Sequence, residues 1–386
     1  MDEEAYVLLL STSKIILERR YILKSSKKIV ICMLLIVVSI ISLTLINTST
    51  NKTFNYKGST IALTIDGNSA TSFPSSGKYN VTVNCNNAKG RWNPKTWKLE
   101  ITKITGTVTC DVSFNSSVTN LTTQIDNKAT RDENGKRYQG KNPDNYIWFN
   151  DELWRIIGNI PVCLTSGCSS TQNRVKIIRN DSIGAIAFNQ TDYSASSPLT
   201  WMGSNIQNLL NSCYLGKKSS CDDYCYSYQA SAKGTCDYSS DGIDTADYYG
   251  NMVEDVYFNV GAGDSTYKTA TNYYTQEIAT HATNTSKIGL MYASDWGYAI
   301  EDFTEVLGSS GRPQKSSEKN WLMSNGDEWT MSTYSSSNPL YAYGGGYLYN
   351  SSASDGYSIR PVLYLKSNVY VVSGTGTKVD PYRIGM

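Results

Sequence analysis

Alternation of apolar and polar positions is the clearest pattern between residues 58 and 116. Residues 60–65 (TIALTI) and 97–101 (WKLEI) follow it, and turn signals such as Asp66-Gly67 separate these runs. Alternation with a period of two is typical of strands that bury one face. The pattern therefore predicts a small antiparallel β-sandwich over residues 58–116.

Strand and helix signals are mixed over residues 144–386, after a polar connector at 117–143. The run YIWFNDELWRIIG predicts a hairpin that turns at Asn150-Asp151. Further strand signals lie at 175–180, 287–293, 329–331, 341–349 and 359–365, and apolar residues at helical spacing lie at 200–211 and 272–281. The whole is predicted to be an α+β domain with long loops. The longest of these loops, residues 212–271, is rich in Tyr, Asp, Ser and Cys.

Residues 29–46 (IVICMLLIVVSIISLTLI) contain no charged side chain. As a helix they would span about 27 Å, close to the thickness of a bilayer core. Basic residues in the preceding tail, 1–28, predict a cytoplasmic N-terminus. The expected protein crosses the membrane once, with a polar stalk at 47–57 and an extracellular C-terminal part. A cleaved signal peptide and a buried soluble helix are the alternatives. The long tail and the lack of a small-residue cleavage site favour the anchor.

Cysteines agree with an oxidising exterior, because one of the nine lies within the apolar run and eight follow it: Cys85, Cys110, Cys163, Cys168, Cys213, Cys221, Cys225 and Cys236. An even number predicts a disulfide framework. Cys85 and Cys110 share the inward faces of two predicted strands, and Cys163 and Cys168 flank a short turn, so each pair is a candidate bridge. The other four are expected to pair among themselves, in an order that the sequence leaves open. A zinc site is the alternative, but the paired C-x2-C spacing is absent and no metal is predicted.

Charge and the remaining chemistry exclude several function classes. The net charge is +1, which argues against nucleic acid as a partner. A single histidine, His281, removes most nucleophile–histidine arrangements. Asp295 with Asp327-Glu328 is a candidate carboxylate pair for glycoside hydrolysis, although acids in an Asn-Gly-Asp-Glu turn are more often solvated. No catalytic residue and no cofactor is predicted.

Several segments carry a resemblance to a family: YIWFNDELWRIIG, VKIIRNDSIG, IGLMYASDWGYA, NWLMSNGDEWTMSTYSSSN and IRPVLYLKSNV. Together they resemble surface proteins of gut-dwelling Firmicutes, whose distal module is similar to the C-type-lectin-like fold of formylglycine-generating-type domains. The resemblance implies such a domain over residues 144–386. The resemblance carries over neither the copper–thiol chemistry of formylglycine-generating enzymes nor the calcium-dependent sugar binding of lectins. No cysteine follows Cys236 to form a copper–thiol site. In addition, Glu328-Trp329-Thr330 and Ser337-Asn338-Pro339 lack the carboxylates of a calcium lectin.

A tyrosine-rich stretch near the C-terminus is the candidate binding surface. Alternation places Tyr341 with Tyr343, and Tyr347 with Tyr349, on either side of a Gly-Gly-Gly turn. The candidate platform is completed by three more aromatic residues, Trp329, Tyr334 and Tyr357. Ordinary half-buried strand tyrosines are the alternative. The sequence thus predicts a non-enzymatic cell-surface binding or adhesion protein for a glycan or protein ligand. The alternatives are a glycan-active surface hydrolase and a purely architectural envelope protein.

Overall fold

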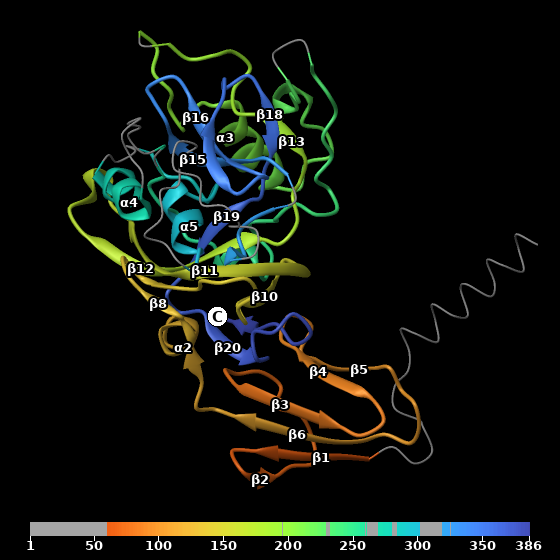
Figure 1. Cartoon of the computed structure of the whole chain (residues 1–386). Helices are drawn as coiled ribbons and strands as arrows, with labels where there is room; N and C mark the ends of the chain where they lie inside the picture. The colour runs from red at the N-terminus through yellow and green to blue at the C-terminus, as the bar shows by residue number, and fades with distance from the viewer. Residues whose placement is uncertain are drawn as a thin grey trace, which may run out of the picture. The chain divides into compact units, whose positions relative to one another are not determined.

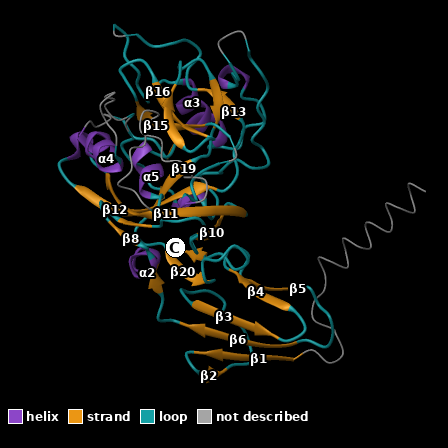
Figure 2. Ribbon diagram, in the orientation of Figure 1, coloured by secondary structure: helices purple, strands orange, loops and turns teal. Residues whose placement is uncertain are grey.

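Figure 1 shows the computed structural model of the chain, which describes residues 60–386 apart from positions 195, 229–231, 259, 261–268, 280–283, 302–318 and 325. Residues 61–105 and 110–386 belong to one compact unit. Strands account for 38% of the structure and helices for 14%, so the fold is mostly β (Figure 2). The predicted α+β class is therefore wrong. The helices are short, and most of the long 212–271 segment is loop.

No helix within the described residues is both long enough and apolar enough to cross a membrane. The described residues therefore give no support to the predicted transmembrane helix or to the single-pass membrane location built on it. The predicted tail, span and stalk (1–28, 29–46 and 47–57) lie outside the described residues. A run of apolar residues is necessary for a span, but it is a signal of composition and does not by itself define one.

Strands dominate residues 60–115, as the alternation predicts. A four-stranded sheet has the order β2-β1-β6-β3, built from β1 (Thr60–Ile65), β2 (Asn68–Ser69), β3 (Asn80–Cys85) and β6 (Thr109–Asn115). A separate hairpin joins β4 (Lys89–Asn93) to β5 (Lys98–Thr102). The ring of Trp92 on β4 is buried 4.8 Å from that of Phe114 on β6. Cys85 lies directly opposite Cys110 in the β3–β6 register, and the two form a disulfide, which confirms that candidate bridge.

Residues 117–143, predicted to be a polar connector, contain regular elements. These are β7 (Thr119–Asn120), α2 (Leu121–Lys128), β8 (Arg131–Asp132) and β9 (Lys136–Arg137). Leu121 and Ile125 of α2 are buried one turn apart, as expected of a helix that presents one apolar stripe. The helix packs on two long strands, β11 (Glu152–Cys163) and β12 (Thr171–Arg179) (Figure 2).

The main sheet has the order β14-β19-β12-β11-β9-β8, with β10 also paired to β11. Besides β8 and β9, its members are β10 (Tyr146–Phe149), β11 (Glu152–Cys163), β12 (Thr171–Arg179), β14 (Ile288–Gly289) and β19 (Val362–Leu365). The hairpin of β10 and β11 turns at Asn150 and Asp151, whose φ angles are 53° and 61°. Two successive positive φ angles are the mark of a type I′ turn. The predicted hairpin is therefore confirmed.

A second sheet, with the order β13-β18-β15-β16-β17, carries the tyrosine-rich stretch. Its strands are β13 (Ala185–Ala187), β15 (Glu328–Thr333), β16 (Pro339–Tyr343), β17 (Tyr347–Asn350) and β18 (Gly356–Ser358). A third sheet joins β7 to β20 (Tyr370–Ser373) and β21 (Arg383–Gly385). The predicted hairpin turn at Gly344–Gly346 is confirmed, because Tyr343 pairs with Tyr347 across it.

Three helices besides α2 are described: α3 (Asn205–Leu209), α4 (Ala270–Ala279) and α5 (Ala293–Tyr298). The first two fall in the segments with helical spacing, and α5 has no predicted counterpart. Short turns occur at Ser166–Cys168, Leu210–Tyr214, Asp222–Tyr224 and Gly250–Met252. In Figure 2, α4 lies beside α5.

Disulfides join Cys163 to Cys168, Cys213 to Cys221 and Cys225 to Cys236, and the last two lie in the long loop. All eight predicted cysteines are therefore paired, and the bridge between Cys163 and Cys168 is confirmed. The pairing that the sequence left open joins consecutive cysteines along the chain. Because these thiols are oxidised, they do not form the alternative zinc site.

Candidate functional site

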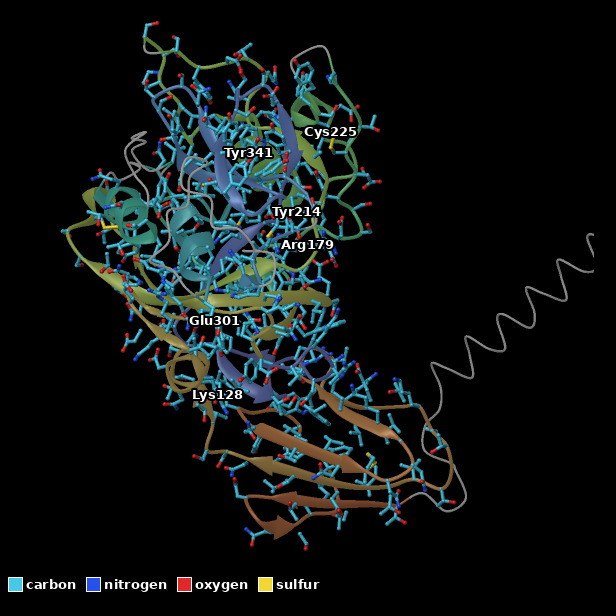
Figure 3. The ribbon with its side chains drawn as sticks, in the orientation of Figure 1. Lys128, Arg179, Tyr214, Cys225, Glu301 and Tyr341 are labelled. Atoms are coloured by element: carbon cyan, nitrogen blue, oxygen red, sulfur yellow. A yellow bond between two sulfur atoms is a disulfide. The ribbon has the colours of Figure 1, made fainter. Side chains whose placement is uncertain are left out.

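Six aromatic residues form a continuous row on the second sheet, and we call them the tyrosine face: Trp329, Tyr341, Tyr343, Tyr347, Tyr349 and Tyr357. The strand register brings them together, because Trp329 lies opposite Tyr341 and Tyr341 lies opposite Tyr349. Tyr343 and Tyr347 face each other at the hairpin end. Tyr341 is labelled in Figure 3 within this upper sheet.

The rings of the tyrosine face are in mutual contact. Tyr341 stacks on Tyr357 with ring centres 4.3 Å apart, and Trp329 meets Tyr357 edge-on at 4.7 Å. At the hairpin end the centres of Tyr343 and Tyr347 are 4.8 Å apart. Stacked and edge-to-face pairs at such separations add about 0.5–1.5 kcal/mol each beyond burial. The rings therefore support one another in fixed positions.

Exposure rises along the tyrosine face toward the hairpin. Trp329 is fully buried and donates its indole N–H to the Ile186 carbonyl at 2.9 Å. Tyr341 is 7% exposed, whereas Tyr343 and Tyr349 are 38% and 44% exposed. The inner rings thus act as a support, and the outer rings present aromatic surface to solvent.

Tyr334 was predicted to belong to this platform, and the structure places it elsewhere. It is 37% exposed and lies at the turn before Asn338, whose carbonyl accepts its backbone N–H. Burial raises the pKa of Tyr273 on α4, and Glu277 and Tyr334 add to this. Among the described residues, no ring contact joins it to the six members of the tyrosine face.

Asp327 also belongs to this surface, although the sequence predicts that it lies in a solvated turn. It stands two residues before Trp329, so strand alternation directs it to the same side of the sheet. Its Oδ1 accepts the backbone N–H of Gly344 at 2.9 Å, which ties the acid to the hairpin turn. Burial and the neighbouring Tyr357 raise the pKa of Tyr341, and the Asp327 charge raises it further. In the sequence, its spacing of two residues from Trp329 was the signal that could have predicted this position.

Glu328, the other acid of that turn, is buried rather than solvated. It is 1% exposed, and the Arg360 guanidinium donates to both of its oxygens at 2.8 and 3.0 Å. Strand alternation points it to the side of the sheet opposite Trp329, so Asp327 and Glu328 face different environments. Neither acid is joined to Asp295, the other member of the candidate pair, whose two oxygens are held by Arg137 and Lys176.

The long 212–271 loop meets the second sheet at its other edge. The Ser227 carbonyl lies so close to Gly356 on β18 that an added Cβ would approach it to 1.7 Å. Tyr226 also accepts the backbone N–H of Ala187 on β13. The loop therefore packs on β13 and β18, whereas the exposed tyrosines lie on β16 and β17 at the far side of the sheet order.

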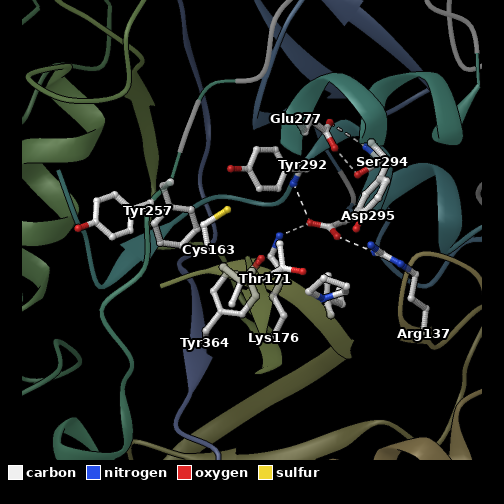
Figure 4. Close-up of a pocket in the computed structure, with 15 residues that line it drawn as sticks. Arg137, Cys163, Thr171, Lys176, Tyr257, Glu277, Tyr292, Ser294, Asp295 and Tyr364 are labelled. Atoms are coloured by element: carbon white, nitrogen blue, oxygen red, sulfur yellow. Dashed lines mark hydrogen bonds and ion pairs between the residues drawn. The ribbon is translucent and has the colours of Figure 1, made fainter. Parts of the chain in front are cut away.

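A buried pocket beside the main sheet is the second candidate (Figure 4). Asp295 at the start of α5 lies at its centre: Lys176 contacts Oδ2, and Arg137 donates to Oδ1 at 2.9 Å. Burial alone would raise the pKa of Asp295, but the charges of Lys176 and Arg137 outweigh it and hold the pKa below its usual range. Burial lowers the pKa of Lys176. Both oxygens of Asp295 are thus engaged.

Glu277 on α4 lines the same pocket without a hydrogen-bonded cation. It accepts from the Ser294 backbone N–H at 3.2 Å and from the hydroxyls of Ser294 and Ser332. Burial raises its pKa to about 7, and the nearby Asp295 adds to this although the serine hydrogen bonds oppose it. Sequence offered no signal for this group, because its partners come from distant segments.

The pocket is too small for a sugar. Its cavity volume is about 40 Å³, which is room for about three water molecules and far below the roughly 300–1,000 Å³ of small-molecule sites. The two carboxylates have a raised and a lowered pKa, as hydrolases require, but Asp295 is held by two cations and neither acid faces an open cleft. The arrangement fits a buried structural network.

Other predicted chemistry finds no support in the described part of the chain. No cluster of three His, Cys, Asp or Glu side chains there could hold a metal ion. His281 lies outside the described residues.

Comparison with protein families, with curated proteins and with solved structures gives no match to this chain. The resemblance to C-type-lectin-like surface proteins therefore stays a prediction. The function has to be inferred from the chain's own residues.

Proposed function

We propose that this protein is a non-catalytic extracellular binding protein that recognises glycans through the tyrosine face. The observation that carries the proposal is the gradient of exposure along the contacting rings, from fully buried Trp329 to half-exposed Tyr343 and Tyr349. Tyrosine rings offer rigid area for stacking on the apolar faces of sugars, and their hydroxyls form hydrogen bonds. The four disulfides support an oxidising extracellular environment.

Two further features support binding rather than catalysis. The exposed rings lie on a hairpin at the edge of a sheet rather than in a deep cleft. Among the described residues, the pocket that holds Asp295 and Glu277 is small, and its Asp295 is ion-paired with both Arg137 and Lys176. A surface of stacked rings with few charges is suited to an extended ligand that lies across it.

The proposal is tested on a glycan array with the purified full-length protein and two matched variants. Tyr343→Ala removes an exposed ring of the tyrosine face, and Tyr334→Ala removes an equally exposed ring outside it. We expect Tyr343→Ala to weaken binding about five- to tenfold, the value of one stacking contact of about 1 kcal/mol. Tyr334→Ala should bind as the wild type does. Equal losses in both variants, or no binding to any glycan by the wild type, would contradict the proposal.

A further inference from the structure

The stretch of chain that carries the tyrosine face contains charges of one sign. No Lys or Arg occurs between Trp321 and Ile359, whereas this stretch contains Asp327, Glu328 and Asp355. Glu328 is neutralised by Arg360 on the buried side of the sheet. Asp327 and Asp355 are the two acids of this stretch that form no ion pair within the described structure.

Both of these acids are connected to the rings. Asp327 is bonded to the hairpin turn through the Gly344 N–H and interacts with the Tyr341 hydroxyl. Asp355 accepts from the Ser351 hydroxyl, which in turn accepts from the Tyr357 hydroxyl at 3.2 Å. A carboxylate thus stands at each end of the row of rings, on Asp327 at the hairpin turn and on Asp355 next to β18.

The chain's own cations stack on other aromatic rings. Arg383 lies 4.3 Å over Trp148, Arg137 lies 4.6 Å over Tyr298, and Lys176 lies 4.4 Å over Tyr292. In the part of the chain that the structure describes, no Lys or Arg is stacked on a ring of the tyrosine face. The faces of these rings carry negative partial charge, which attracts a cation that approaches them.

We infer that the tyrosine face selects glycans that carry protonated amino groups, with Asp327 as the residue that distinguishes them from neutral sugars. This deepens the proposed function and rests on it. The pyranose ring stacks on Tyr343 and Tyr349, and the ammonium group of an amino sugar lies near the Asp327 carboxylate. Acetylation of that amino group removes the charge and leaves the stacking surface of the ring in place.

Oligomers of glucosamine and of N-acetylglucosamine of equal length are the matched probes, because they share one backbone and differ in charge. Titration calorimetry with the full-length protein at low salt measures both. We expect the glucosamine oligomer to bind about tenfold more tightly, as a cation near aromatic rings and a half-buried carboxylate should. Added salt should weaken only the charged oligomer.

Asp327→Asn is the decisive variant, because asparagine keeps an oxygen that can accept the Gly344 N–H while it removes the charge. We expect it to reduce glucosamine binding to the level of the acetylated oligomer and to leave the latter unchanged. Asp111→Asn, an exposed acid on β6, makes the same change in net charge and should alter neither affinity.

The outcomes separate this inference from the proposed function. Equal binding of both oligomers, still lost in Tyr343→Ala, would overturn the amino-sugar preference and leave glycan binding in place. A preference that persists in Asp327→Asn would overturn the role of Asp327. Failure of both oligomers together with every other glycan on the array would overturn the proposed function itself.

Discussion

Replacement of Glu277 by glutamine should change the pH dependence of stability, because the pKa of this buried carboxyl is raised to about 7. Glu277 is fully buried, and its hydrogen-bond partners are the Ser294 backbone and two serine hydroxyls. The charged groups that face it are Asp295, Lys176 and, across the same pocket, Arg137. Glutamine preserves the shape and removes the ionisation, and the serine hydroxyls can rotate to accept its N–H groups.

The magnitude follows from the difference in proton affinity between the folded and unfolded chains. The pKa of Glu277 is raised from 4.5 to about 7 because burial disfavours its charge. The folded state therefore binds the proton more tightly, and stability falls as the pH rises from about 4.5 through 7. Above pH 7 the full cost is about 3 kcal/mol, since one pKa unit corresponds to about 1.4 kcal/mol.

Urea unfolding with intact disulfides, measured between pH 5 and pH 8, checks this expectation. The wild type should lose stability across that range, whereas Glu277→Gln should be more stable than the wild type at pH 8 and about equal to it near pH 5. A difference between the two proteins that stays constant with pH would refute the reasoning. It would mean that Glu277 is ionised in both states or that water enters its pocket.

Glu100 is the matched control, because its pKa is shifted in the opposite direction. Burial would raise it, but hydrogen bonds from Asn93 and Arg91 outweigh burial and lower the pKa. A lowered pKa in the folded state contributes stability above the unfolded value, and this contribution is lost as the pH falls. Glu100→Gln should therefore destabilise the protein at pH 8 and have less effect at low pH. A Glu100→Gln profile that resembled that of Glu277→Gln would point to a general effect of net charge.

Three further substitutions test the packing. Lys176→Met leaves buried Asp295 with one cation, so we expect a loss of about 3–5 kcal/mol in denaturant unfolding, and a loss below 1 kcal/mol would contradict the buried pairing. Removing the bridge by Cys85→Ser with Cys110→Ser opens a loop of 25 residues, for which we expect a loss of about 3 kcal/mol and a lower Tm in calorimetry. Gly356→Ala would bring a methyl group to 1.7 Å from a carbonyl oxygen of the long loop, so it should cost about 1–3 kcal/mol and make that loop easier to cleave by protease.

Local signals in the sequence predicted the hairpins and the first two disulfides well. The turn at Asn150 and Asp151 follows from residues that tolerate positive φ, and the alternation around Cys85 and Cys110 directs both side chains to one face. In these cases the structure-determining contacts lie within a few residues, or between two strands of matching pattern. The turn at Gly344–Gly346 is of the same kind, because Tyr343 pairs with Tyr347 across it.

The missed elements depend on contacts between distant segments. Helix α5 has only six residues, and its Asp295 is held by Arg137 and Lys176, which are 158 and 119 positions away. No local periodicity in the sequence indicates such a short helix, because tertiary contacts rather than local propensity stabilise it. The place of Glu277 in the buried pocket could not be predicted from the sequence for the same reason. The α+β class was wrong because the two predicted helical segments form only the short helices α3 and α4, so strands dominate the fold.

The position of the tyrosine face in the fold bears on how it can bind. Its inner rings are fixed by burial and by the Trp329 hydrogen bond, and the outer rings Tyr343 and Tyr349 each contact a neighbouring ring of the face. A rigid aromatic surface therefore loses little entropy on binding. Stacking alone, however, distinguishes sugars weakly, because many pyranose rings present an apolar face. Selectivity must then come from the few polar groups at the rim, and Asp327, bonded to the hairpin turn that carries these rings, is the charged group best placed to supply it.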